Sequence, residues 1–88
     1  RKEIVMARVE INMPRFGAQM KEGKILEWKV AVGDTVEEDD ALLEVKAEKM
    51  DAEVEALDEG KVVEIIAKVG ETYPVGAVLG YIETDDED

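Results

Sequence analysis

The chain has 88 residues and a formal net charge of −12, with 23 acidic against 11 basic side chains, no His and no Cys. This length fits one small domain, and the missing His and Cys exclude disulfides, the usual zinc sites, a thiol nucleophile and a Ser-His triad. The charge argues against nucleic acid or an anionic membrane as a partner. We expect neither a membrane span nor a signal peptide. Because the chain begins at Arg1, we expect a fragment or a processed product.

Apolar and polar side chains alternate along several stretches, which is the pattern of β-strands. The clearest stretches are residues 5–13, 43–47 and 52–56. Each has one apolar face and one charged face, as in a half-buried antiparallel sheet. Gly, Pro and Asp residues separate these stretches, and helical spacing is not sustained. We therefore predict an all-β domain, either a sandwich or a flattened barrel.

An internal repeat relates the two halves of the chain. With a shift of 37 residues, positions 22–45 match positions 59–82 at 8 of 24 places, whereas ordinary composition gives about one or two matches. Neither half can bury its apolar face alone, so we predict two similar halves packed around a pseudo-twofold axis. Lys49 lies between the repeats and corresponds to position 86. We therefore expect a hairpin at Lys49 and the C-terminus at opposite ends of the domain.

A charged hairpin is predicted around Lys49, and two registers keep its apolar faces aligned. One register has Glu48 and Lys49 as the loop, sets Lys46 opposite Asp51 and removes Met50 from the exposed tip. The other sets Glu48 opposite Asp51, which opposes two carboxylates at a cost of about a few tenths of a kcal/mol. The first register is favoured because it pairs opposite charges.

Lys49 stands at the tip in either register. A surface lysine is ordinarily a solubilising side chain, but its primary amine can also be acylated, and the four-carbon stem then gives the attached group reach. Lys49 is therefore the candidate attachment point. The hairpin residues that flank it, and that a modifying or partner enzyme would meet, are Ala47, Glu48, Met50 and Asp51. No catalytic residue is predicted, because the chain has no His or Cys. No metal site is predicted either, because the acidic run 37–40 lacks calcium-loop spacing and is expected to be a solvated turn.

Several motifs together resemble a known family. Residues 13–28 contain Met-Pro, a Gly, Met-x-Glu-Gly and an apolar pair before Trp28, and Glu48-Lys49 falls where the family carries Asp-Lys. Further matching positions are Gly33, Asp34, Val36, Asp40, Leu42, Gly60, Gly70, Val75, Gly76 and Leu79. In this order and spacing, from about Val9 to Glu83, the chain resembles the lipoyl domains of 2-oxo acid dehydrogenase complexes, within the biotinyl/lipoyl attachment family.

The resemblance implies a flattened barrel of two four-stranded antiparallel sheets over residues 1–83, with an acidic tail or linker start at 84–88. It implies lipoate on Lys49, attached by a lipoate ligase or lipoyl transferase, and a swinging-arm carrier without catalytic machinery of its own. The implied partners are a thiamine-dependent 2-oxo acid decarboxylase, an acyltransferase core and dihydrolipoyl dehydrogenase. The implied compartment is the cytoplasm, or the mitochondrial matrix in a eukaryote.

The resemblance also assigns a recognition role to the loop after the first strand. This loop, with Phe16, Gly17 and Met20, would lie near the lysine tip and help the decarboxylase recognise its own domain; packing within the loop is the alternative. Trp28 is expected to be a core or sheet-face anchor rather than a partner contact.

Two positions depart from the lipoyl pattern. Met50 follows the lysine where lipoyl domains often have Ala, and biotinyl domains carry Met on both sides of their lysine. A biotinyl domain of a biotin-dependent carboxylase or decarboxylase is therefore an alternative, and an unmodified structural module of the same fold is a third. Asp39 stands where the family often has Gly and where the second half keeps Gly76. Asp tolerates a left-handed turn better than most residues, so the fold should survive.

Overall fold

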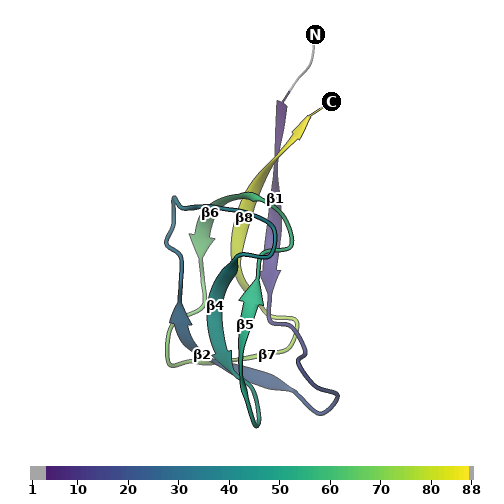
Figure 1. The fold of residues 1–88 in the computed structure, drawn as a ribbon, viewed down its shortest axis with the longest axis vertical. Coiled ribbons are helices and arrows are strands. Elements are labelled where there is room, and N and C mark those ends of the chain that lie inside the picture. The colour runs from purple at the N-terminus through teal and green to yellow at the C-terminus, as the bar shows by residue number, and fades with distance from the viewer. Residues whose placement is uncertain (1–3, 88) are drawn as a thin grey trace.

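Two four-stranded antiparallel sheets make up the domain (Figure 1). The computed structural model describes residues 4–87, and it describes side chains for residues 7–84. One sheet, here the terminal sheet, has the strand order β1-β8-β6-β3, and the other, the hairpin sheet, has the order β5-β4-β2-β7. The strands are β1 (Ile4–Asn12), β2 (Glu22–Trp28), β3 (Thr35–Val36), β4 (Ala41–Lys46), β5 (Asp51–Glu55), β6 (Gly60–Ile65), β7 (Thr72–Pro74) and β8 (Val78–Glu87). The all-β prediction is confirmed, and the form is a flattened sandwich rather than a closed barrel.

The predicted pseudo-twofold symmetry is present down to the register of the strands. In the hairpin sheet β2 pairs with β4, with Ile25 opposite Val45. In the terminal sheet β6 pairs with β8, with Val62 opposite Ile82, and each of these residues lies 37 positions after its counterpart. Both pairings also have an irregularity at the same place, one residue after Ile25 and one after Val62. The repeat in the sequence is therefore also a repeat in the pairing of the strands.

The two halves exchange their shortest strands. Strand β3 of the first half pairs with β6 of the second, and β7 of the second half pairs with β2 of the first. Each sheet thus contains a strand from the other half, and neither half can complete its sheet alone.

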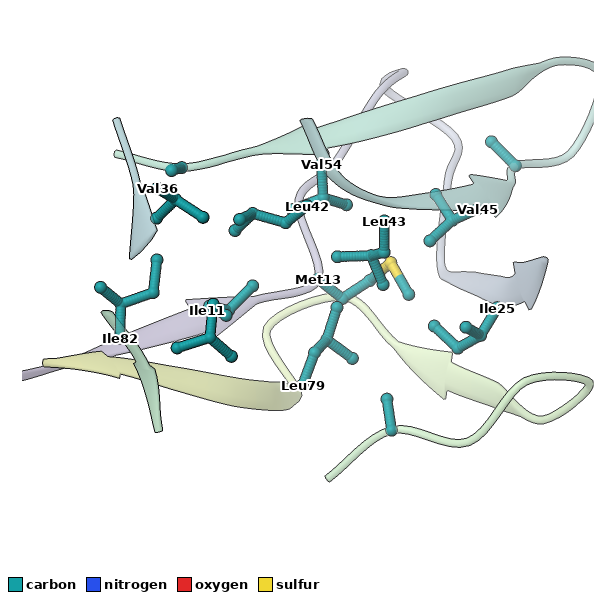
Figure 2. Close-up of a cluster of buried hydrophobic side chains, with 14 of the residues drawn as sticks. Ile11, Met13, Ile25, Val36, Leu42, Leu43, Val45, Val54, Leu79 and Ile82 are labelled. Carbon is teal, nitrogen blue, oxygen red and sulfur yellow. The ribbon is translucent and has the colours of Figure 1, made fainter. Parts of the chain in front are cut away.

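The core lies between the two sheets and is built from the inward side chains of both (Figure 2). Leu42 and Leu79, which are equivalent by the repeat, are both fully buried, as are Ile25, Val45 and Val62. Alternation is what delivers these side chains to one face: along β2, Gly23 and Ile25 are buried while Glu22 and Lys24 are exposed. Burial of this apolar area, at about 25 cal/mol per Å², is the main stabilising contribution to the fold.

Backbone geometry explains the residue type at two positions, Gly60 and Asp39. Gly60 lies so close to the backbone of β8 that a Cβ atom there would collide with the carbonyl oxygen of Glu83. Asp39 has φ of 73° and its repeat equivalent Gly76 has φ of 91°. The expectation that Asp39 adopts a left-handed turn in place of Gly is confirmed. Asp is among the few non-glycine residues that adopt this conformation at small cost.

Trp28 anchors the hairpin sheet to the turn that follows β6. Its indole is partly buried against the core, and Nε1–H donates a hydrogen bond to the carbonyl oxygen of Ala67 at 2.8 Å. The prediction of a structural anchor is confirmed.

A Trp28→Phe variant is expected to lose about 1–2 kcal/mol in the free energy of unfolding. The ring packing is largely kept, but the buried carbonyl of Ala67 loses a donor. Urea unfolding followed by circular dichroism measures this loss. Tyr73→Phe is the matched control, because the hydrogen bonds of the Tyr73 hydroxyl are exposed to solvent. Their removal should cost less than about 0.5 kcal/mol. Equal costs for the two variants would contradict the assignment.

The hairpin between β4 and β5 and the two chain ends lie at opposite ends of the molecule (Figure 1). Strands β1 and β8 continue together from Val9 opposite Ile82 to Ile4 opposite Glu87. The predicted opposition of hairpin and C-terminus is confirmed. Strand β8 continues beyond the predicted domain boundary at Glu83 because its backbone keeps pairing with β1. The role of 84–88 as a linker stays a prediction, and Asp88 lies outside the described residues.

Candidate functional site: the lysine hairpin

Lys49 lies in the connection between β4 and β5, residues 47–50, and is one of the two residues at its tip. Lys46 is opposite Asp51, and the N–H of Ala47 donates to the carbonyl oxygen of Met50 at 2.8 Å. This is the favoured one of the two predicted registers, and it leaves Glu48 and Lys49 as the loop. This hydrogen bond closes the loop at its base, and the Lys49 side chain is exposed at the tip.

The hairpin side chains divide into one buried residue and an exposed tip. Ala47 is only 6% exposed, whereas Glu48, Lys49 and Asp51 are all exposed. Met50 is 53% exposed, so the expectation that this register removes Met50 from the exposed tip is wrong. The reason is that the opposing sheet ends before the hairpin does. There Met50 lines a cleft together with the loop after β1.

That loop, residues 13–21, packs beside the hairpin. The two line a cleft that includes Phe16, Met20, Ala47, Lys49 and Met50. The N–H of Met20 donates to the Gly17 carbonyl oxygen at 3.1 Å, and the N–H of Phe16 donates to the sulfur of Met20 at 3.2 Å. The structure therefore brings the predicted recognition residues next to the predicted attachment site.

The three recognition candidates differ in what they offer a partner. Gly17 is exposed and Phe16 is half-buried, but Met20 is 4% exposed and belongs to the core. Met20 therefore holds the loop against the hairpin, and Phe16 and Gly17 supply its accessible surface.

The amine of Lys49 is available for acylation. Within the side chains that the structure describes, no ion pair or hydrogen bond involves Lys49. An exposed primary amine on a fixed turn fits a group that is attached through an amide.

No cluster of metal ligands is found among the described residues. In the acidic turn 37–40 the Asp40 carboxylate accepts a hydrogen bond from the Glu37 N–H at 2.9 Å. No helix in residues 4–87 is long and apolar enough to cross a membrane.

Comparison with known proteins identifies the family. A family model described as "Biotin-requiring enzyme", which covers biotinyl and lipoyl domains, matches residues 9–82. The chain belongs to the biotinyl/lipoyl attachment family. The two-sheet sandwich agrees with this family, and the role of Lys49 as the attachment residue stays a prediction.

Individual relatives are similar over most of this domain. The chain is 45% identical, over 86% of its length, to the dihydrolipoyllysine-residue acetyltransferase component of the pyruvate dehydrogenase complex of Corynebacterium glutamicum, and covers 11% of that protein. It is 38% identical, over 91% of its length, to the lipoamide acyltransferase component of the branched-chain alpha-keto acid dehydrogenase complex of Bacillus subtilis, and covers 19% of it. The chain thus spans at most about a fifth of the length of these curated relatives.

A solved structure has the same fold. The solution structure of the lipoyl domain of the 2-oxoglutarate dehydrogenase complex from Azotobacter vinelandii superposes with a TM-score of 0.68 and 27% sequence identity. The match covers 84% of this chain and 94% of that one, so the similarity extends over whole domains.

Sequence reasoning did not single out a group of lysines that lies on the other side of the hairpin. Lys21, Lys24 and Lys46 line a hollow together with Ala47 and Glu48. The repeat could have indicated this group, because two of its lysines stand where the second half has carboxylates. Lys21 corresponds to Asp58 and Lys46 to Glu83.

Proposed function

We propose that this domain is a swinging-arm carrier that is lipoylated on Lys49. It would shuttle acyl groups and electrons between the active sites of a 2-oxo acid dehydrogenase complex, as part of the acyltransferase component. The observation that carries the proposal is the position of Lys49, exposed on a two-residue turn at the end of the sandwich opposite both termini. A group attached there points away from any tether to a larger protein.

The similar proteins favour lipoate over biotin as the attached group. The acyltransferase relatives are named for dihydrolipoyllysine or lipoamide, and the solved neighbour is a lipoyl domain. Glu48 before the lysine agrees with the acidic residue of the lipoyl pattern. The observation in favour of biotin is Met50, which is more than half exposed beside the lysine.

The domain contributes position rather than chemistry. When attached, the lipoyl group supplies a dithiolane that can carry an acyl group and two electrons, and the reactive atoms belong to the cofactor. The protein holds the base of the arm on a closed turn. Tethering of the domain raises the effective concentration of the arm at each active site.

The partners follow from this role. They are a lipoate ligase or lipoyl transferase, a thiamine-dependent 2-oxo acid decarboxylase, the acyltransferase core and dihydrolipoyl dehydrogenase. The branched-chain and pyruvate relatives support a complex of this kind. We place the protein in the cytoplasm, or in the mitochondrial matrix if its source is a eukaryote. The domain itself would hold no active site.

The test is the intact mass of the protein after incubation with a lipoate ligase and lipoate, and separately with a biotin ligase and biotin. We expect one lipoyl increment in the first reaction and none in the second. A biotinyl increment alone would favour the alternative carrier. The absence of both increments would leave the unmodified structural module as the correct reading.

A further inference from the structure

The pseudo-twofold symmetry produces two equivalent hollows, and they differ in charge. One hollow lies beside the lysine hairpin and is lined by residues of β2, β4 and β7. The other lies near the chain ends and is lined by the equivalent residues of β6, β8 and β3. Lys24 of the first corresponds to Lys61 of the second, and Lys46 corresponds to Glu83. The same backbone thus presents two different sets of side chains.

The hollow beside the hairpin is basic although the chain as a whole has a net charge of −12. Its lining contains three lysines (Lys21, Lys24 and Lys46) and two glutamates, a net charge of +1. The equivalent hollow contains one lysine and four carboxylates, a net charge of −3. Since the fold is the same at both places, it does not demand the basic set. The difference indicates a function at the hairpin end.

One cross-strand pair of these lysines opposes the stability of the sheet, while on its other side Lys46 is opposite Asp51. Lys24 and Lys46 are directly opposite each other on β2 and β4, and both are exposed. Like charges that face each other across strands are destabilising. At the equivalent place in the terminal sheet, Lys61 is opposite Glu83, which is the favourable combination. In the part of the chain with described side chains, none of the three lysines forms an ion pair.

An enzyme that modifies Lys49 must cover this hollow. The lysine amine is held only a four-carbon stem from the hairpin backbone, so the enzyme surface has to approach the hairpin itself. A specific interface covers about 800 Å² on each partner, which is far more than a two-residue loop supplies. Ala47 and Glu48 of the hairpin line the hollow directly. The hollow therefore falls within the footprint.

We infer that the Lys24–Lys46 hollow is a docking surface for carboxylate side chains on the enzyme that acylates Lys49. This inference rests on the proposed function and names the chemistry of one partner surface. The charge on the outer face of the hairpin sheet then changes along the strands: Lys24 and Lys46 lie with Asp51 in the row nearest the hairpin, and Glu27, Glu44 and Glu53 form a carboxylate row farther from it. Two charges of opposite sign fix the orientation of a partner as well as attracting it.

The test uses Lys24→Glu and Lys46→Glu, with Lys61→Glu as the matched control in the equivalent hollow. The probe is a lipoate ligase, and the quantity measured is kcat/KM for lipoylation of Lys49 over a series of NaCl concentrations. At low salt we expect each hollow variant to lose about three- to tenfold in kcat/KM, with a weaker salt dependence, because electrostatic attraction between exposed charges acts on association and is screened by salt. Lys46→Arg keeps the charge and should keep the rate. Lys61→Glu should keep the wild-type kcat/KM and its salt dependence, although the new carboxylate opposite Glu83 lowers its stability slightly.

Stability separates this role from a structural one. Lys24→Glu replaces the repulsive pair with Lys46 by an attractive one and faces the uncharged Thr72 on its other side, so its midpoint of urea unfolding should stay the same or rise while kcat/KM falls. Lys46→Glu gains the same attraction to Lys24 but sets two carboxylates opposite each other at Asp51, so its midpoint should change little. Unchanged kcat/KM in both variants, or an equal fall in Lys61→Glu, would overturn the inference. A wild-type domain that accepts no lipoate at any salt concentration would instead overturn the proposed function.

Discussion

A Lys49→Arg variant is expected to accept no lipoyl group, while its free energy of unfolding stays within about 0.5 kcal/mol of the wild type. Arginine keeps the positive charge and the reach of the side chain, but its guanidinium is always protonated and is not an acylatable amine. Lys49 is exposed on the turn, and the hydrogen bond that closes this turn joins backbone atoms of Ala47 and Met50. Surface substitutions of this kind have small effects on stability.

Intact mass after reaction with a lipoate ligase measures the first part, and urea unfolding measures the second. Lys68→Arg is the matched control, because Lys68 is an exposed lysine near a different turn and its replacement should leave the increment in place. Exchange of Glu48 and Lys49 moves the amine by one position within the same loop. It should sharply reduce the rate if the turn presents the amine in one direction. A lipoyl increment on Lys49→Arg would show that another lysine is the attachment site.

The sequence predicted the hairpin well because two independent signals agreed there. Alternation limited the pairing to registers an even step apart, and charge then favoured the one with Lys46 opposite Asp51, which is the observed pair. The burial of its flanking residues was not predictable in the same way. Met50 stands at an inward position of the pattern, yet it is exposed, because periodicity shows which face a residue is on and not where the opposing sheet ends.

The repeat predicted the symmetry but not the exchange of strands between halves. Two similar halves could each have kept their own short strand. In the structure β3 pairs with β6 and β7 pairs with β2. The choice depends on long-range backbone pairing, which leaves no mark in a local pattern. Met20 shows the same limit: its place in a loop suggested a partner contact, whereas its side chain fills the core at the base of that loop.

Leu42→Ala and Leu79→Ala are expected to have the largest effects on stability, each lowering the free energy of unfolding by about 2–5 kcal/mol. Both side chains are 0% exposed, and they occupy equivalent positions on β4 and β8, one in each sheet (Figure 2). Removal of three carbon atoms from either one loses the burial of those atoms and leaves a cavity that the rigid sandwich can close only in part. A domain of this size has only about 5–15 kcal/mol in total.

Leu57→Ala is the matched control, because this leucine is 76% exposed and its truncation should change stability by less than about 0.5 kcal/mol. Urea unfolding of the three variants gives the comparison, with unchanged m-values showing that each still unfolds in one step from the same compact state. Because the pseudo-twofold axis relates the two core positions, their costs should be similar. A large cost at Leu42 with a small one at Leu79 would mean that the hairpin sheet carries the core and that the symmetry of the backbone does not extend to its energetics.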